Sequence, residues 1–121
     1  MGSAAKNSKT QFDEQDMLLP VVDYMHENYN RYISISELAE IFYMHPTYLI
    51  RKFKSLYGVP PLVYFSNIKI KKAIDLLSST NLTIKEVASK LGMDDASYFS
   101  RWFKKHIGFS PLEYRKNLKS R

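Results

Sequence analysis

The feature that most constrains this chain is an internal duplication in the part that follows residue 33. Residues of the segment 35–44 recur 49 positions later, and after one inserted residue those of 48–64 recur 50 positions later. Repetition at a fixed spacing indicates one structural unit that is built twice. The identical pairs are Ile35/Ile84, Glu37/Glu86, Ala39/Ala88, Met44/Met93, Tyr48/Tyr98, Arg51/Arg101, Phe53/Phe103, Lys54/Lys104, Gly58/Gly108, Pro61/Pro111, Leu62/Leu112 and Tyr64/Tyr114.

The hydrophobic pattern of the chain is helical throughout. Proline and glycine fall at apparent boundaries, and no β-branched alternation lasts long enough for a strand. Each repeat therefore predicts a short helix, a tight turn and a longer helix, which is the helix-turn-helix layout. The fold class is all-α with seven helices, expected at about residues 17–28, 36–42, 46–57, 61–78, 84–91, 96–107 and 111–118.

The starts of the short helices repeat the same chemistry. Ser34-x-x-Glu37 and Thr83-x-x-Glu86 both match the capping box. In this motif the hydroxyl accepts from a backbone N–H three residues on, while the glutamate accepts from the N–H of the capping residue. Both repeats are thus expected to begin with a capped helix.

Glycines indicate where helices end. Gly58 and Gly108 suit the left-handed position that follows a helix, because glycine has no Cβ to clash there. Gly92 occupies the turn of the second unit, whereas the matching residue of the first unit is Tyr43. A tyrosine tolerates a left-handed backbone poorly, so we expect the first turn to differ from the second.

The sequence divides into a leader and one duplicated domain. Residues 1–14 begin as Met-Gly-Ser, a typical expression scar, and continue without periodicity, so they are taken as tag and disordered leader. Residues 15–121 form the domain: a first unit at about 15–59, a linker helix at about 61–79 and a second unit at about 82–119. The 121 residues are expected to be a fragment of a larger protein.

The positive charge is concentrated in the duplicated part. The chain carries a formal net charge of +6, of which residues 1–33 contribute −2 and residues 34–121 contribute +8. A basic excess in one region indicates a polyanionic partner. The alternative is that these charges only keep the surface solvated.

Several function classes are disfavoured by what the sequence lacks. The chain has no cysteine, which excludes disulfides and thiolate chemistry, and its four glycines form no phosphate-binding loop. His26, His45 and His106 match no metal-ligand spacing, and Asp94-Asp95 is better explained as a helix start than as an acid–base pair. We therefore predict no catalytic residue, no metal and no cofactor. No apolar run approaches the roughly 20 residues of a membrane span, which fits a cytoplasmic protein.

The longer helix of each unit has two opposed faces. An inner stripe of apolar residues should face the core. The outer stripe, on the opposite side, comprises Thr47, Ile50, Arg51 and Lys54 in the first unit, and Ala96, Ser97, Ser100, Arg101 and Lys104 in the second. The inner stripe comprises Leu49, Phe53 and Leu56, joined by Tyr48, and then Phe99, Phe103 and Ile107 with Trp102 beside them.

The outer stripe has the chemistry of a DNA reader. Arg51 and Arg101 can each present a bidentate fork to guanine O6 and N7 in the major groove, and exposed Ile50 can contact a thymine methyl. Alternatively, the arginines pair with neighbours such as Glu40 or Asp94, and Ile50 is a half-buried packing residue. Basic residues further along suit phosphate contacts, namely Lys54, Lys104 and Lys105.

The linker helix has a length that suits a duplex. Residues 61–78 span roughly 27 Å at about 1.5 Å per residue, and successive major grooves lie about 34 Å apart. Two recognition helices at about 46–57 and 96–107 are thus expected to enter adjacent major grooves. Lys69, Lys71 and Lys72 on the linker helix form either a phosphate clamp, with Lys69 as its candidate contact, or a solvated face.

These motifs together resemble the AraC/XylS-type bacterial transcription regulators. The second unit carries the resemblance most specifically, in the segments 87–93, 97–105 and 108–115. In the first unit and linker it rests on Leu38-Ala39 and the segments 48–54 and 73–77. The resemblance covers about residues 15–119. Departures are Lys69 where the family usually has arginine, Tyr43 in place of glycine, and Pro60-Pro61 in place of a serine-containing segment.

The resemblance implies a DNA-binding domain of two homeodomain-like three-helix units that regulates transcription, often by activation. Its partners would be double-stranded DNA and RNA polymerase, with no membrane. The domain itself would be monomeric, and an effector-binding or dimerising domain would be missing. Base contacts would be drawn from Thr47, Ile50, Arg51, Ala96, Ser97, Ser100 and Arg101.

Other functions are the alternatives to sequence-specific DNA binding. A helical protein–protein adaptor would use exposed tyrosines and isoleucines, and its binding would be insensitive to salt. RNA binding fits the charge, but the repeat offers no aromatic stacking platform of the usual kind. An enzyme would need a catalytic motif, and none is recognisable.

Overall fold

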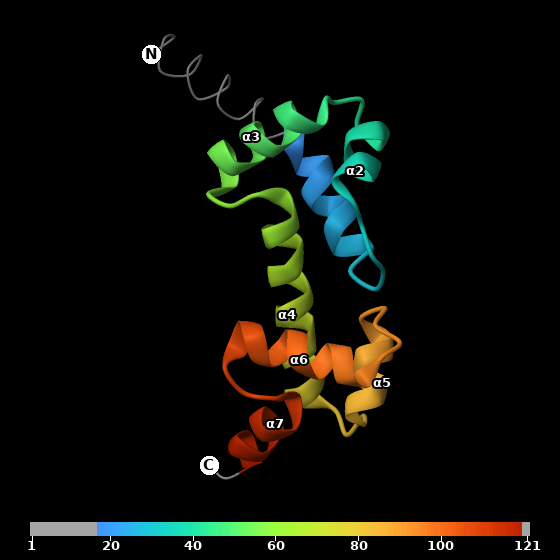
Figure 1. The fold of residues 1–121 in the computed structure, drawn as a ribbon, viewed down its shortest axis with the longest axis vertical. Coiled ribbons are helices and arrows are strands. Elements are labelled where there is room, and N and C mark those ends of the chain that lie inside the picture. Colours follow the sequence, from blue (N-terminus) through green and yellow to red (C-terminus); the bar gives the residue numbers. More distant parts are fainter. Residues whose placement is uncertain (1–16, 120–121) are drawn as a thin grey trace, which may run out of the picture. The chain divides into compact units, whose positions relative to one another are not determined.

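The computed structural model describes residues 17–119, and the tag and leader expected for residues 1–14 lie outside the described residues. Within residues 17–119 the chain forms seven helices and no strand, as predicted (Figure 1). The first helix is described over residues 17–27. The others are α2 (Ile35–Ile41), α3 (Pro46–Tyr57), α4 (Pro61–Ser79), α5 (Ile84–Lys90), α6 (Ala96–Ile107) and α7 (Pro111–Lys119).

The described chain forms two compact units. The first contains residues 17–27 and 33–64, and the second contains residues 28–32 and 65–119. The long helix α4 therefore contributes its first turn to the first unit and the rest of its length to the second. The short segment 28–32, which follows the first helix in sequence, packs with the second unit.

Each unit has its own apolar core, built from the stripes that the helical period predicts. In the second unit the core joins α4, α5 and α6, and the partly buried Tyr114 of α7 packs against it. The fully or nearly fully buried residues are Leu18, Val21, Val22, Met25, Ile33, Leu38, Ala39, Leu49 and Phe53 in the first unit. In the second they are Ala73, Leu77, Val87, Ala88, Leu91, Phe99 and Phe103.

An aromatic pair recurs in the two cores. Phe53 of α3 meets Tyr64 edge-on, with ring centroids 5.4 Å apart and planes inclined by 78°. Phe103 of α6 meets Tyr114 of α7 in the same way, at 5.7 Å and 74°. Edge-to-face contacts of this kind contribute about 0.5–1.5 kcal/mol beyond the burial of the rings. In each unit the helix that follows the turn is thereby held against the next helix along the chain.

The helix starts are capped largely as predicted. Thr83 and Glu86 form the complete capping box of α5, with the two hydrogen bonds at 3.1 and 2.9 Å. At α2 the hydroxyl of Ser34 accepts from the N–H of Glu37 at 3.1 Å. The Glu37 carboxylate also accepts from the hydroxyl of Tyr24, at 2.8 Å, and so ties the first helix to α2.

The start of α7 repeats the reciprocal arrangement. The Ser110 N–H donates to the Glu113 carboxylate at 2.9 Å, and the Glu113 N–H donates to the Ser110 hydroxyl at 3.1 Å. The backbone hydrogen bonds from Ser110 and Thr83 lower the pKa of Glu113 and Glu86, respectively, because each stabilises the charged carboxylate.

The helix-turn-helix turns have the same backbone in both units. The N–H of Met44 donates to the carbonyl of Ala39 at 2.9 Å, and the N–H of Met93 donates to that of Ala88 at the same distance. Gly92 takes a left-handed φ of 78°, and Tyr43 takes a left-handed φ of 54°. The expectation that the tyrosine would change the first turn is therefore wrong. Because the Tyr43 side chain is almost fully exposed, it meets little in this conformation.

Close packing restricts position 92 to glycine, in addition to its left-handed backbone conformation. A Cβ built on it would lie 2.9 Å from Cα of Arg31 and closer still to the carbonyl of Asn30. Both neighbours are backbone atoms of the segment 28–32, which therefore sits directly on the second turn. A side chain at this position has to displace that segment.

We expect Gly92→Ala to lower the free energy of unfolding by roughly 3 kcal/mol or more, since it adds a backbone collision to a left-handed strain of about 1–2 kcal/mol. Gly108→Ala is the matched control. Gly108 is also left-handed, with φ 97°, but its Cβ would have nothing within 4 Å. Urea denaturation of the two variants checks the difference, and equal losses would contradict the packing of residues 28–32 on Gly92.

Candidate nucleic-acid interface

The orientation of α3 is fixed by what it buries. Pro46 occupies its first turn, and Nδ1 of the preceding His45 accepts from the N–H of Thr47 at 3.2 Å. Leu49 and Phe53 are fully buried, so the opposite side of the helix faces solvent. The outer-stripe residues of α3 are all exposed: Thr47, Ile50, Arg51 and Lys54.

The helix α6 has the same construction with a stronger cap. The Asp95 carboxylate accepts from the N–H groups of Ser97 and Tyr98 at 2.8 and 3.3 Å. Phe99 and Phe103 are fully buried. Of the residues predicted to contact DNA, four are exposed, namely Ser97, Arg101, Lys104 and Lys105, while Ala96 and Ser100 are half-buried.

The two arginines are free to meet a ligand. Among the described residues, neither Arg51 nor Arg101 makes a hydrogen bond or an ion pair, so the alternative pairing with Glu40 or Asp94 is not observed. An exposed guanidinium carries five N–H donors in a planar fork. The two forks therefore stand at equivalent places of α3 and α6 with their donors available.

Ile50 is only moderately exposed. Its side chain is 37% exposed, which leaves its methyl groups accessible from solvent. The position one turn before Lys54 gives the first unit an apolar spot within an otherwise polar stripe. The corresponding residue in α6 is Ser100. The two outer stripes therefore share their arginine and lysine but differ at the residue just before the arginine.

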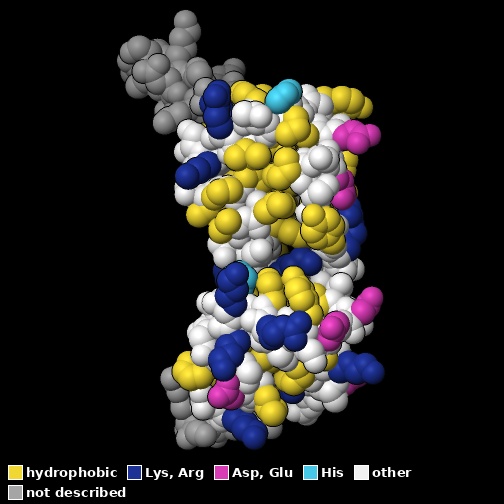
Figure 2. All heavy atoms as spheres, in the orientation of Figure 1, with side chains coloured by type: hydrophobic (Ala, Val, Ile, Leu, Met, Phe, Trp, Pro, Cys, Tyr) yellow, Lys and Arg dark blue, Asp and Glu magenta, His cyan; other side chains and the backbone are white. Residues whose placement is uncertain are grey.

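Basic side chains are more prominent over the second unit. Figure 2 shows one face of the molecule, on which Lys and Arg side chains gather over α6 and α7, while hydrophobic side chains gather over the first unit. Three basic or titratable residues close α6, namely Lys104, Lys105 and His106. Cations near a helix C-terminus are favoured by the helix dipole, and they also suit a phosphate partner.

Lys69 has a different environment from the other predicted phosphate contacts. It is only 8% exposed, its ammonium donates to the carbonyl of Leu91 at 3.3 Å, and it lies 5.0 Å from the centroid of the Phe65 ring. Desolvation by burial lowers the pKa of Lys69. Its hydrogen bond supports the end of α5, and its burial leaves the prediction of a phosphate contact for Lys69 without support.

Tyr48 of α3 differs from the sequence expectation, and its counterpart Tyr98 of α6 is exposed as well. Tyr48 was placed with the inner stripe, yet it is 40% exposed, and its counterpart Tyr98 is 51% exposed. The prediction of a core position for Tyr48 is therefore wrong. The offset of 50 pairs Tyr48 with Tyr98, but it also pairs the buried Phe53 with Phe103, so the repeat alone does not indicate exposure.

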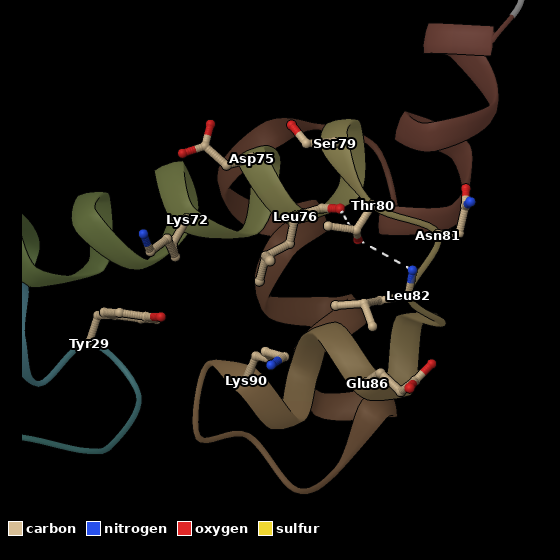
Figure 3. A pocket seen from close by; sticks show the side chains of 10 residues that line it. All are labelled: Tyr29, Lys72, Asp75, Leu76, Ser79, Thr80, Asn81, Leu82, Glu86 and Lys90. Atoms are coloured by element: carbon tan, nitrogen blue, oxygen red, sulfur yellow. Dashed lines mark hydrogen bonds between the residues drawn. The ribbon is translucent and has the colours of Figure 1, made fainter.

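A separate hollow lies on the second unit between residue Tyr29, the end of α4 and α5 (Figure 3). Its volume is about 790 Å³. Three of the polar side chains that line it interact with neighbouring parts of the second unit. The hydroxyl of Thr80 donates to the carbonyl of Leu76 at 2.6 Å and accepts from the N–H of Leu82 at 3.3 Å (Figure 3). Glu86 belongs to the capping box, and the Lys72 ammonium lies 5.0 Å from the Tyr29 ring centroid.

Within residues 17–119 no cluster of three or more His, Asp or Glu side chains is arranged to hold a metal ion. No helix in that range has the length and apolar character needed to cross a membrane.

Comparison with known proteins gives consistent matches over most of the chain. A family model described as a helix-turn-helix domain matches residues 38–117. The HTH-type transcriptional regulator YisR of Bacillus subtilis is 38% identical over 93 residues, which cover 77% of this chain and 32% of YisR. The chain spans about a third of the length of such curated relatives, from 31% to 41% for three of them.

Solved structures share the fold. The C-terminal domain of AraT, a response regulator from Geobacillus stearothermophilus, matches with a TM-score of 0.79 and 32% identity over 84% of both chains. The DNA-binding domain of the global transcriptional factor AdpA, solved in complex with a target DNA, matches with a TM-score of 0.78 and 27% identity. This match covers 85% of the present chain and 93% of the AdpA chain.

The burial of Lys69 predicts a pH dependence of stability. Because its pKa in the folded protein lies below the ordinary 10.5, the unfolded chain binds more protons between those two values. The contribution of Lys69 to stability therefore rises with pH across that window and is lower at neutral pH. We expect the free energy of unfolding of the wild type, minus that of Lys69→Met, to increase from pH 7 towards pH 10.5.

Urea denaturation at several pH values measures this difference. Lys71→Met, at an exposed position of the same helix, is the control and should give a difference that stays flat. A flat or falling difference for Lys69→Met would show that the ammonium is not desolvated in the folded protein.

Proposed function

The chain belongs to the AraC-type family of helix-turn-helix DNA-binding transcription regulators, and from this membership we propose that it reads a specific double-stranded DNA sequence through α3 and α6. The observation that carries the proposal is the pair of outer stripes with Arg51 and Arg101 at equivalent, exposed positions, neither of them paired with another described residue. Buried Phe53 and Phe103 on the opposite side hold these stripes towards solvent.

The residues divide into base contacts and phosphate contacts. Arg51 and Arg101 donate to guanine, Thr47 and Ser97 reach base edges from the first turn of their helices, and Ile50 contacts a thymine methyl. Ala96 and Ser100 complete the reading surface of α6, where short side chains permit a close approach of the helix. Phosphates are contacted by lysines further along the two helices, namely Lys54, Lys104 and Lys105.

We propose the wider role from the family and from the curated relatives, of whose length the chain spans about a third. We propose that this domain is the DNA-binding part of a longer bacterial regulator that acts on RNA polymerase in the cytoplasm. In this proposal the domain binds as a monomer, any dimerisation or effector binding resides elsewhere in the protein, and the domain catalyses no reaction. The adaptor hypothesis is set aside, because the family is one of DNA-binding regulators.

Selection from randomised duplexes at a stated salt concentration is the direct test of sequence-specific binding, since affinities depend strongly on salt. We expect two short conserved boxes, one for each outer stripe. One box would mean that only one helix reads bases, and the absence of any enriched sequence would overturn the proposal.

Arginine variants test base reading on the selected duplex. We expect Arg51→Lys and Arg101→Lys each to weaken binding by about 1–3 kcal/mol and to relax discrimination at one base position, because lysine keeps the charge but lacks the fork. Binding to an unrelated duplex should change little. The measurement is the Kd on both duplexes at one salt concentration, and normal discrimination by the double variant would contradict base reading by these arginines.

A lysine variant tests the phosphate contacts. We expect Lys104→Gln to weaken binding to the selected and the unrelated duplex by the same factor. The slope of log K against log salt should become shallower by about 0.9, the effect of one lost phosphate contact. Lys85→Gln, at an exposed position of α5, is the charge-matched control and should leave the slope unchanged. Equal effects of both variants would indicate a nonspecific loss of charge.

A further inference from the structure

The exposed tyrosines of α3 and α6 are not explained by packing. Tyr48 and Tyr98 are paired by the same offset of 50 as the arginines. About half of each side chain is exposed, although both belong to helices whose other aromatic residues pack inward. Among the described residues neither ring stacks on another ring, and neither hydroxyl makes a hydrogen bond.

The position of each tyrosine on its helix is defined by the helical period. At about 100° per residue, Tyr48 lies about 60° around the helix from Arg51, and Tyr98 lies equally far from Arg101. Residues separated by three positions are neighbours on one side of a helix. Each tyrosine thus stands at the border of the outer stripe, one turn before the arginine.

In α6 this border continues with a basic residue. Lys105 follows Tyr98 by seven positions, two turns along nearly the same line, and it is exposed. The corresponding residue of α3 is Ser55, which is also exposed. The border line of each helix therefore carries a phenol near its start and a polar or charged group near its end.

Such a border faces the wall of a groove when the outer stripe faces its floor. The wall of the major groove is the sugar–phosphate backbone, whose oxygens accept hydrogen bonds from tyrosine hydroxyls as well as from lysine and arginine. A phenol is rigid, with two rotatable side-chain bonds before the ring, so it fixes a helix at little cost in entropy. It also carries no charge, and hence releases no counterion when it binds a phosphate.

We propose that Tyr48 and Tyr98 are positioning residues of the DNA interface, each donating its hydroxyl to one phosphate oxygen on the groove wall and thereby setting the register of the adjacent arginine. The proposal rests on the DNA-binding function proposed above. In this proposal the two uncharged tyrosines fix the position of each helix in its groove. The lysines supply the salt-dependent attraction to DNA.

The test removes only the two hydroxyl oxygens. We expect Tyr48→Phe and Tyr98→Phe each to weaken binding roughly 10- to 150-fold, the effect of one hydrogen bond to a charged acceptor. The same factor should apply to the selected and the unrelated duplex, and the salt slope should stay at its wild-type value. The melting temperature should also be unchanged, because the hydroxyls make no hydrogen bond to any described residue.

Tyr32→Phe is the matched control, since Tyr32 is 78% exposed but lies outside α3 and α6. A loss of affinity for Tyr32→Phe equal to that of the other two variants would overturn the proposal. Unchanged affinity of the Tyr48→Phe, Tyr98→Phe double variant would overturn it as well, and so would a change in base preference without a loss of affinity. In each of these outcomes the wild type still binds DNA, which separates them from a failure of the proposed function.

Neutral phosphate analogues locate the contacts. Methylphosphonate is placed at one phosphate at a time in the selected duplex. We expect the analogue at one phosphate to weaken binding of the wild type but not of Tyr48→Phe. At a second phosphate it should weaken binding of the wild type but not of Tyr98→Phe. Such loss of coupling identifies the contacting pair. Independent effects of analogue and variant at every phosphate would overturn the assignment.

Discussion

The edge-to-face contact between Phe53 and Tyr64, repeated as Phe103 and Tyr114, is the interaction on which the rest of the structure depends. A helix exposes whatever lies opposite the residues it buries. Once the phenylalanine is locked against the tyrosine of the next helix, the rotation of α3 or α6 about its own axis is settled. The arginine two positions before the phenylalanine then points to solvent, and no further interaction is needed to direct it there.

The helical period and the boundary residues of the sequence were sufficient for most of the fold. Pro46 and Gly58 bracket α3, and Asp95 and Gly108 bracket α6, so these helices have the predicted bounds. The faces followed from the same period, because leucine and phenylalanine at positions such as Leu49 and Phe99 leave no doubt about the buried side. Local chemistry repeated in two copies made these predictions firm.

Amphipathic residues marked the limit of this reasoning. A tyrosine at the border between the buried and the exposed face of a helix is compatible with either face. The pattern alone therefore assigned Tyr48 to the wrong face. Lys69 was predicted to be exposed and is buried instead. Its long apolar stem can lie in the protein interior when the ammonium reaches a carbonyl. That carbonyl belongs to Leu91, which is distant in sequence, so no local pattern indicates the contact. The packing of residues 28–32 on Gly92 is likewise a long-range contact that no local signal announces.

The two copies have diverged in the chemistry of their outer stripes while keeping their framework. α3 begins with a histidine cap and offers an isoleucine, whereas α6 begins with an aspartate cap and offers serines and an additional lysine. Under the proposed function, the shared arginine and lysine would anchor both copies in the same way. The differing residues would give each copy its own base preference, which suits a duplex site of two unlike halves.

The left-handed, outward-facing Tyr43 has a practical consequence. The chain contains no cysteine, so Tyr43→Cys would create one unique thiol at a site whose side chain is 96% exposed and whose backbone already tolerates a Cβ. A fluorophore or spin label attached there would stand two residues before the cap of α3. The turn thus provides a spectroscopic reporter position for events at the first recognition helix.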